Sequence, residues 1–401
     1  MKEAYIVDGS RTAFGSFRGT LSPIRTDDLL AHVIRSLVAN NPTIPKDAYD
    51  DVIIGCANQA GEDNRNIARM GLLLAGLPWS VPGETINRLC ASGMSAIVQA
   101  NRAIKAGEAD LIISGGVEHM TRGPLVISKS AKPYGGDSKI YDSSFGWRFI
   151  NPAMEKLYGT ESMGNTAENL AEQHHINRED QDMFAHWSQM KASQAQKSGR
   201  LAKEIVATEI PRRKQDPLQF DQDEFIRHDT TIEGLSKLRA AFKAEGTVTA
   251  GNASGLNDGA AAVIVASEDA VKKYQLTPLA RIVSSAVAGV EPRIMGIGPV
   301  PASQKALERA GLKLEDIGVI EMNEAFAAQT LACTRTLGLD DQDPRLNPNG
   351  GAIALGHPLG ASGTRISHSL ALELVDKNQR YGLATMCVGV GQGYALVLEK
   401  V

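Results

Sequence analysis

The 401-residue sequence predicts an α/β fold made of two similar halves with one inserted segment. Short apolar runs of strand length alternate with helical segments, which indicates a mostly parallel sheet covered by helices. The pentapeptide LCASG at residues 89–93 recurs as LGASG at residues 359–363. Between residues 120 and 247 the alternation stops and the chain becomes more polar, which is typical of an insertion.

The first half contains the clearest secondary-structure signals, which are apolar runs bounded by glycine and helical periodicity between them. The predicted elements are, in order, a strand at 4–8, a loop at 11–15, a helix at 26–39, a strand at 51–55, a helix at 66–76, a short strand and a helix around Cys90, and a buried strand at 110–116.

The second half repeats this order. The strand at 51–55 corresponds to residues 318–322, and the strand at 111–115 corresponds to residues 383–387. Duplicated βα units predict two similar domains packed about a pseudo-twofold axis. Within the repeated pentapeptide Cys90 corresponds to a glycine, so the halves are alike in structure and different in chemistry.

These patterns divide the chain into three units. We expect an N-terminal domain formed by residues 1–119 and 248–270, and a C-terminal domain formed by residues 271–401. The inserted segment, residues 120–247, shows renewed helical periodicity at 166–198. An excursion of this kind is well placed to cover a site at the junction of the two halves.

Charge and hydropathy argue against several classes of function. A net charge of −4 gives no electrostatic support for binding nucleic acid or an anionic membrane. No apolar run is long enough to cross a bilayer, and the N-terminal residues read as a strand instead of a signal peptide. The four cysteines show no CxxC spacing, which favours a reducing compartment, and we expect a cytoplasmic protein.

Cys90 is the strongest candidate for chemistry. It lies at or near a helix N-terminus, where backbone N–H groups and the helix dipole favour a thiolate. A lone cysteine is also compatible with a buried, inert thiol. His357 and Cys387 lie in two distant glycine-flanked stretches and could supply the base and the second acid/base that carbon–carbon chemistry requires.

Five stretches in this order closely resemble the motifs of the thiolases. They are TINRLCASGMSAI at 85–97, GNASGLNDG at 251–259, NEAF at 323–326, NGGAIALGHPLG at 349–360 and MCVGVGQG at 386–393. The resemblance covers nearly the whole chain. It implies the thiolase fold, in which two βαβαβ domains form a layered α-β-α-β-α core and an inserted loop domain binds coenzyme A.

The resemblance also implies roles for single residues. Cys90 matches the nucleophile that carries the acyl group, and His357 matches the base that activates it. Cys387 matches the acid/base for the α-carbon, and an ordinary thiol pKa near 8.5 suits proton transfer in both directions. The backbone N–H groups of Cys90 and Gly389 match one oxyanion hole. Asn323 matches the residue that holds a water in the other, beside His357.

The coenzyme A contacts are carried over in the same way. Ser254 matches a contact to the pantetheine arm, and Arg227 matches a basic contact to the nucleotide end. Phe326 and Met163 match apolar lining near the thioester. The chain departs from several short-chain biosynthetic members, because Ser162 stands where they have a histidine before the Met-Gly pair. This departure weakens an assignment to acetoacetyl-CoA.

Three further features of the sequence have a structural interpretation as well as a functional one. Glu324 could orient the site or be a buried, paired acid. Residues 389–393 superficially match a dinucleotide-binding loop, but no helix follows them, so we reject that site. His174 and His175 lack metal-ligand spacing and indicate a solvated helix end. We therefore predict no metal.

The implied reaction is thiolytic cleavage of a 3-oxoacyl-CoA by ping-pong acyl transfer through Cys90. Coenzyme A is then a substrate, no metal or nicotinamide cofactor is needed, and the family suggests a homodimer or homotetramer. Alternatives are a medium-chain 3-ketoacyl-CoA thiolase of fatty-acid oxidation, an acetoacetyl-CoA thiolase and, more remotely, a non-catalytic acyl-CoA-binding relative. A non-catalytic relative would be expected to lack Cys90, His357 or Cys387.

Two stretches, residues 55–66 and 145–149, resemble thiolases of aromatic-compound breakdown, which cleave 3-oxoadipyl-CoA into succinyl-CoA and acetyl-CoA. That substrate ends in a carboxylate, for which an arginine fork is the natural partner. Arg65 and Arg148 lie in these stretches and are candidates, although each could be structural. Arg69 belongs to a pattern found more widely among thiolases and is a poor candidate.

Overall fold

The computed structural model describes residues 2–401. Its main sheet contains β1 (Ala4–Thr12), β3 (Asp51–Gly55), β4 (Glu84–Ile86), β5 (Leu111–His119), β11 (Asn257–Ser267), β12 (Ala280–Gly289), β13 (Ile317–Met322), β14 (Tyr381–Val388) and β15 (Gln392–Lys400). The strand order is β13-β14-β15-β12-β1-β11-β5-β3-β4. Apart from the edge strand β4, the order reads symmetrically outward from the β12–β1 pair, which confirms the predicted duplication.

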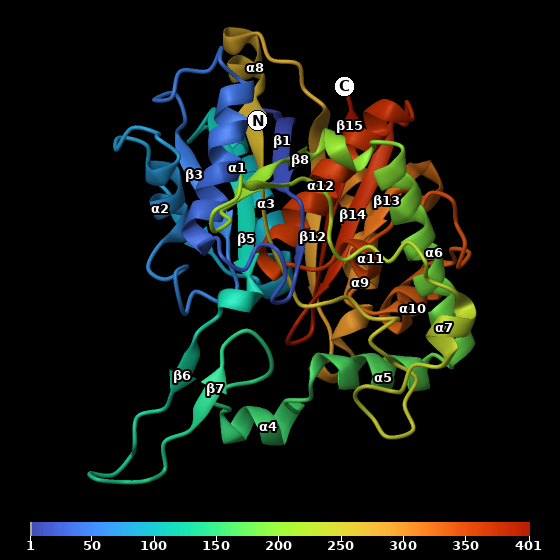
Figure 1. Cartoon of the computed structure of the whole chain (residues 1–401). Coiled ribbons are helices and arrows are strands. Elements are labelled where there is room, and N and C mark those ends of the chain that lie inside the picture. Colours follow the sequence, from blue (N-terminus) through green and yellow to red (C-terminus); the bar gives the residue numbers. More distant parts are fainter. Residues whose placement is uncertain (1) are drawn as a thin grey trace.

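Helices cover both halves and also lie between them (Figure 1). The principal ones are α1 (Thr26–Asn40), α2 (Ile67–Leu74), α3 (Ser92–Ala106), α9 (Pro299–Ala310), α10 (Ala327–Leu337) and α12 (Leu359–Asp376), with the short α8 (Glu268–Tyr274) and α11 (Ala352–Leu355). The central pair α3 and α12 pack on each other, and α12 also contacts β5 and β11 of one half and β13 and β14 of the other. Three apolar clusters fill the spaces between these layers. The predicted layered α-β-α-β-α core is therefore present.

The sheet is mixed, so the prediction of a mostly parallel sheet was wrong. β3 pairs in parallel with β4 and β5, and β13 pairs in parallel with β14. In contrast, β11 is antiparallel to both β1 and β5, and β15 is antiparallel to both β12 and β14. A tight turn joins β14 to β15, and Gly391 in that turn has φ +80°. A connection this short can only join antiparallel neighbours.

Several element boundaries also differ from the predictions. β1 continues through Arg11 and Thr12, which we had placed in a loop, and β5 continues to His119, beyond the break expected after Gly116. Cys90 lies in a single 3₁₀ turn, η1 (Leu89–Ala91), between β4 and α3. The polar residues at the ends of β1 and β5, such as Arg11 and Glu118, are buried and continue the strand pairing. The alternation of apolar and polar residues in the sequence does not reveal this.

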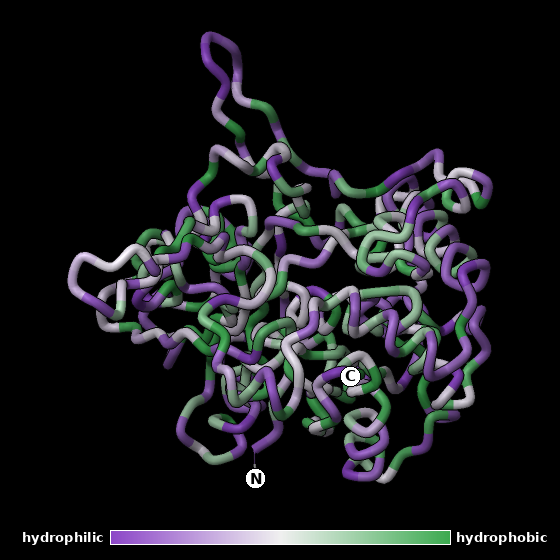
Figure 2. Tube along the Cα trace, turned by 90° about the horizontal axis from the view of Figure 1, so that it is seen from below, coloured by the Kyte–Doolittle hydropathy of each residue, from purple (hydrophilic) through white to green (hydrophobic). Residues whose placement is uncertain are grey.

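The inserted segment contains β6 (Leu125–Ile127), β7 (Ile140–Asp142), α4 (Pro152–Tyr158), α5 (Met163–Gln173), α6 (Arg178–Lys197), β8 (Ile205–Val206), β9 (Thr208–Ile210), β10 (Leu218–Phe220) and α7 (Ile232–Ser236). The β6–β7 hairpin projects from the body (Figures 1 and 2). The periodicity at 166–198 proves to be two helices, because His174 caps α5 and His175 has φ +53°. This confirms the interpretation of the two histidines as a helix end.

A buried ion network ties the inserted segment to the core. Arg11 on β1 bonds Glu204 at 2.9 Å and Asp223 at 2.7 Å. Arg200 bonds the same Glu204 at 2.8 Å and Glu373 of α12 at 2.6 Å. Burial alone would raise the pKa of Glu204, but the Arg11 and Arg200 guanidinium groups lower it to about 2. The network also satisfies charges that would be costly to bury alone.

We predict that Glu204→Gln lowers the free energy of unfolding by about 3 to 5 kcal/mol, because it breaks a buried ion pair. The folded-state pKa of Glu204 lies below the unfolded value of about 4.3. Its contribution is therefore complete above about pH 4.3 and is lost as the pH falls through 2. Thermal unfolding should show a Tm gap between wild type and variant that narrows from pH 5 to pH 2.

The control is Glu233→Gln, since the ion pair between Glu233 and Lys237 is exposed to solvent. This variant should unfold like the wild type at every pH. A Tm loss in Glu233→Gln as large as that in Glu204→Gln would show that the buried network has no special role.

Candidate active site

Cys90 lies where β4 meets α3, in a turn held by its neighbours. Leu89 has φ +48°, the Ser92 hydroxyl donates to the Leu89 carbonyl at 2.6 Å, and the Arg88 N–H donates to the Ser92 hydroxyl at 2.9 Å. The backbone N–H groups of Gly389 and of Cys90 itself point at the sulfur. The two N–H groups of the predicted oxyanion hole thus meet at one atom.

The protonation state of Cys90 differs from the expectation. Burial raises the pKa of the thiol to about 11, although the N–H groups of Gly389 and Cys90 act in the opposite direction. The charge of Glu118 adds a smaller upward shift. The prediction that the helix N-terminus favours a thiolate was therefore wrong for the free protein, because loss of hydration outweighs the helix dipole.

His357 is held in one orientation and one tautomer. Its backbone N–H donates to Asn257 Oδ1 at 2.9 Å, and a side chain at Gly356 (φ +99°) would collide with that asparagine. The Ser362 hydroxyl donates to the Pro358 carbonyl at 2.9 Å, so His357 Nδ1, 2.6 Å from Ser362 Oγ, carries the proton and donates to it. His357 Nε2 therefore carries the lone pair, as a base requires.

Burial, with a smaller contribution from the charge of Arg365, lowers the pKa of His357 to about 3. The imidazole is therefore neutral at pH 7. Its Nε2 atom lies 3.4 Å from Asn323 Nδ2, so Asn323 lies beside His357, and the water that the resemblance implies between them and the substrate stays a prediction. Neutral Nε2 can accept a proton from a thiol and can then donate it.

Asn323 and Cys387 lie on neighbouring strand ends. The Asn323 N–H donates to the carbonyl of Thr385 on β14 at 3.0 Å, and β14 also carries Cys387. Asn323 Oδ1 is buried and finds no hydrogen-bond partner among residues 2–401. Asn323 thus presents an unused acceptor beside His357.

Cys387 is fully buried, and its thiol titrates much later than expected. Burial raises its pKa well above the usual range, and charge on Cys90 and Cys333 raises it further. The prediction of an ordinary pKa near 8.5 was therefore wrong. The turn η1, which carries Cys90, packs against β14, which carries Cys387. At neutral pH Cys387 is a proton donor.

Glu118 is a site residue that the sequence analysis missed. Its carboxylate, at the end of β5, accepts N–H groups from Ala57 at 3.0 Å, Asn58 at 3.0 Å and Gly360 at 2.9 Å. Burial raises its pKa to about 7. The available signal was a single acid in an apolar strand after two glycines. Glu118 joins the N-terminus of α12, next to His357, to the loop beside Cys90.

Cys56 and Asp63 complete a buried cluster with Glu118, in which one ligand-type atom from each residue lies within 4.8 Å of the others. Hydrogen bonds account for this arrangement. Cys56 Sγ donates to Asp63 Oδ2 at 3.8 Å, Asp63 Oδ1 accepts the Gly61 N–H at 2.8 Å, and Glu118 is occupied by backbone donors. We assign no metal to the cluster, and the absence of a metal stays a prediction.

The residues expected to contact coenzyme A come from the inserted segment and from both halves of the core. Met163 begins α5, with its sulfur 3.9 Å from the position of a Cβ on Gly389. The Ser254 N–H donates to the Ala325 carbonyl at 3.0 Å, beside Phe326. Arg227 is exposed and lies over the ring of Phe225.

Glu324 is a buried acid engaged in hydrogen bonds. Its carboxylate accepts the Ser188 hydroxyl at 2.6 Å, Asn347 Nδ2 at 2.7 Å and the Ile353 N–H at 3.2 Å. Of the two interpretations left open, the structure favours the paired acid. It stabilises the segment that leads to His357 and has no hydrogen bond to the imidazole among the described residues.

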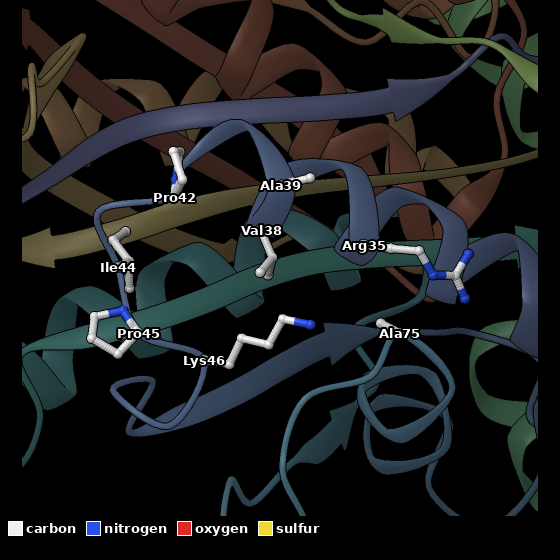
Figure 3. Close-up of a pocket in the computed structure, with 8 residues that line it drawn as sticks. All are labelled: Arg35, Val38, Ala39, Pro42, Ile44, Pro45, Lys46 and Ala75. Atoms are coloured by element: carbon white, nitrogen blue, oxygen red, sulfur yellow. The ribbon is translucent and has the colours of Figure 1, made fainter.

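A shallow surface hollow lies elsewhere on the N-terminal half (Figure 3). Arg35, Val38 and Ala39 of α1 line it, with Ala75 after α2 and residues 42–46 of the following loop. None of the predicted catalytic or coenzyme A residues borders it. None of the helices within residues 2–401 has the length and hydropathy needed to span a membrane.

Comparison with known proteins identifies the family. Residues 4–269 match the thiolase N-terminal domain, and residues 276–400 match the thiolase C-terminal domain. The chain belongs to the thiolase family.

Individual relatives are similar over their whole length. A beta-ketoadipyl-CoA thiolase of Acinetobacter baylyi is 57% identical over 401 residues, which is 100% of both chains. The 3-oxoadipyl-CoA/3-oxo-5,6-dehydrosuberyl-CoA thiolase of Escherichia coli K12 is 56% identical with the same coverage. The crystal structure of human mitochondrial 3-ketoacyl-CoA thiolase in complex with CoA has a TM-score of 0.92 at 41% identity, covering 100% of this chain and 98% of that one.

We predict that alkylation of Cys90 by iodoacetamide rises with pH up to about 11, because only the thiolate reacts and its fraction grows about tenfold per pH unit below the pKa. Glu118→Gln removes a neighbouring negative charge, which lowers the pKa of Cys90 and should speed alkylation at pH 8. Mass spectrometry of the Cys90 peptide measures both rates. A rate that reaches its plateau near pH 7 would instead support the helix-stabilised thiolate.

Proposed function

We propose that the protein cleaves 3-oxoadipyl-CoA with coenzyme A to give succinyl-CoA and acetyl-CoA. As a member of the thiolase family it is an acyltransferase. The observation that carries the substrate assignment is full-length identity of 54 to 57% to relatives named beta-ketoadipyl-CoA thiolase. The two stretches that resemble thiolases of aromatic-compound breakdown support it.

In the first half-reaction the Cys90 sulfur attacks the 3-oxo carbon. Because Cys90 begins as a thiol and His357 as a neutral imidazole, the proton passes to Nε2 as the carbon–sulfur bond forms. The N–H groups of Gly389 and Cys90 bind the oxygen as it becomes negative. The bond between C2 and C3 then breaks, which leaves succinyl on Cys90 and the enolate of acetyl-CoA.

Cys387 then donates its thiol proton to the enolate carbon and becomes a thiolate. We assign stabilisation of the enolate oxygen to His357, which is now protonated, and to Asn323 through a bound water. In the second half-reaction coenzyme A gives its thiol proton to Cys387 and attacks the acyl group. Cys90 leaves and recovers its proton from His357, which restores the starting state.

Binding of coenzyme A is assigned to Ser254, Arg227, Phe326 and Met163. Coenzyme A is a substrate here, and the cycle needs no metal or redox cofactor. We further propose a cytoplasmic location, which suits four free cysteines. A homodimer or homotetramer would cover apolar side chains exposed on the β6–β7 hairpin, such as Leu125, Ile127 and Ile140.

The alternatives have weaker support. An acetyl-CoA acetyltransferase of Allochromatium vinosum is 46% identical over 98% of each chain, below the identity to the beta-ketoadipyl-CoA thiolases. A non-catalytic relative is disfavoured, because Cys90, His357 and Cys387 are all present. A medium-chain 3-ketoacyl-CoA thiolase would catalyse the same reaction on a different acyl group. Only a comparison of substrates separates that alternative from the proposed function.

We predict that the enzyme prefers 3-oxoadipyl-CoA to the uncharged 3-oxohexanoyl-CoA, a chain of equal length, by at least about tenfold in kcat/KM. The measurement is a thiolysis panel that also includes acetoacetyl-CoA and longer 3-oxoacyl chains. A preference for an uncharged medium chain would assign the protein to fatty-acid oxidation instead.

We predict that Cys387→Ala separates acyl transfer from carbon–carbon cleavage. The variant should still accept an acetyl group from acetyl-CoA on Cys90, since that step uses only Cys90 and His357. It should lose cleavage and exchange of the acetyl-CoA α-protons with deuterated water. Cys90→Ser is the matched control and should lose the trapped acyl group. Exchange at the wild-type rate in Cys387→Ala would show that another group is the acid/base.

A further inference from the structure

The two stretches that resemble thiolases of aromatic-compound breakdown lie far apart in the sequence and meet in the structure. Asn58 Nδ2 donates to the Ser143 hydroxyl at 3.2 Å. Arg148 Nη1 donates to the Ser143 carbonyl at 2.9 Å, and Nη2 approaches Asn58 Oδ1 at 3.4 Å. The loop after β3 and the loop after β7 thus form one polar cluster.

This cluster lies next to the reactive centre on the side of Glu118. The Asn58 N–H donates to Glu118 Oε1 at 3.0 Å, and the charge of Glu118 acts directly on Cys90. Asn87, three residues before Cys90, donates through Nδ2 to the Ala57 carbonyl at 2.9 Å. The loop that carries Asn58 is therefore bonded both to Glu118 and to the segment that leads into Cys90.

The loop that carries Arg148 also contacts the segment just before α5. The Trp147 indole N–H donates to the Glu161 carbonyl at 3.2 Å, just before α5, and Met163 at the start of α5 approaches Gly389. Residues 147 and 148 therefore link the segment just before α5 to the loop with Asn58. Both of these neighbours adjoin elements of the site, because Met163 of α5 approaches Gly389 and the Asn58 N–H binds Glu118.

Arg148 differs in its partners from Arg65 and from two arginines outside these stretches, Arg69 and Arg122. Its guanidinium is half-buried and, within residues 2–401, makes no ion pair with a carboxylate. Arg122 is paired with Glu62, and Arg69 donates to backbone carbonyls, among them Trp79 at 2.8 Å. Arg65 is fully exposed. A half-buried cation with neutral partners is matched to an anionic ligand.

Arg88 is nearer to Cys90 in sequence but is directed elsewhere. Its guanidinium lies over the Tyr394 ring and donates to Gln392 Oε1 at 3.0 Å, on β15. It therefore belongs to the contact between the two halves and is not available to the acyl chain.

We propose that Arg148, with Asn58, forms the subsite that binds the distal carboxylate of a dicarboxylic 3-oxoacyl chain. The inference rests on the proposed function and adds the residues that select the charged substrate. Arg148 has five N–H donors, of which two are engaged, so it can offer a fork to the carboxylate. Asn58 orients the guanidinium through Oδ1. Because the Asn58 side chain is uncharged, it does not neutralise Arg148 and leaves that positive charge to the substrate carboxylate.

The test compares kcat/KM for 3-oxoadipyl-CoA and 3-oxohexanoyl-CoA in variants of the full chain. For Arg148→Met the ratio of charged to uncharged substrate should fall about 10- to 100-fold, the loss expected for a hydrogen bond to a charged group. Arg148→Lys should retain part of the preference. Asn58→Asp should lower the ratio while Arg148 is still present, because the new carboxylate competes for the guanidinium. Arg65→Met is the matched control and should keep the wild-type ratio.

The outcomes separate the two proposals. If the wild type prefers 3-oxoadipyl-CoA and Arg148→Met loses activity equally on both substrates, the residue is structural and the subsite is overturned while the proposed function stands. The same holds if Arg65→Met, and not Arg148→Met, changes the ratio. If the wild type has no preference for the charged chain, the proposed function itself fails.

Discussion

The Glu118 carboxylate is the point through which the two halves of the molecule are held in register at the site. It accepts backbone N–H groups from the loop after β3 and from Gly360 at the start of α12. Cys90 follows the strand beside that loop, and His357 precedes α12. One buried acid therefore fixes the relative position of nucleophile and base. Because the bonds are to backbone donors, they constrain the main chain and leave the reactive side chains free.

The reactive groups share a second property, which is that burial keeps each of them neutral. It raises the pKa of the Cys90 and Cys387 thiols and lowers that of His357. A preformed thiolate–imidazolium pair would be costly in such surroundings. Proton transfer is therefore coupled to bond formation with the substrate. A neutral imidazole is a base at only one of its two nitrogens. The hydrogen bond from Nδ1 to Ser362 is therefore important, because it leaves Nε2 as the nitrogen that accepts the proton.

The sequence was most informative where chemistry and repetition were local. The duplication and the buried strand at 51–55 could be predicted from the residues themselves, whereas the grouping of Cys90 with Gly389 and of Asn323 with His357 was implied by the resemblance to the thiolases. Strand direction could not, because the antiparallel pairs β11–β5 and β15–β12 join strands that lie far apart in the sequence. The thiol pKa values were missed because they depend on burial, and Glu118 was missed because its partners are backbone groups with no sequence signal.

The repeat also explains why only one half carries the nucleophile. At Gly360 a Cβ would lie 2.3 Å from the Val117 carbonyl and 2.7 Å from that of Gly55, so no cysteine fits there. This close approach allows the Gly360 N–H to reach Glu118. Cys90, at the corresponding place in the other half, instead faces the Gly389 N–H. The starts of α3 and α12 pack on each other, since a Cβ on Gly93 would lie 2.6 Å from the Gly360 carbonyl, so the two repeated pentapeptides meet at the junction of the halves and only the first supplies a nucleophile.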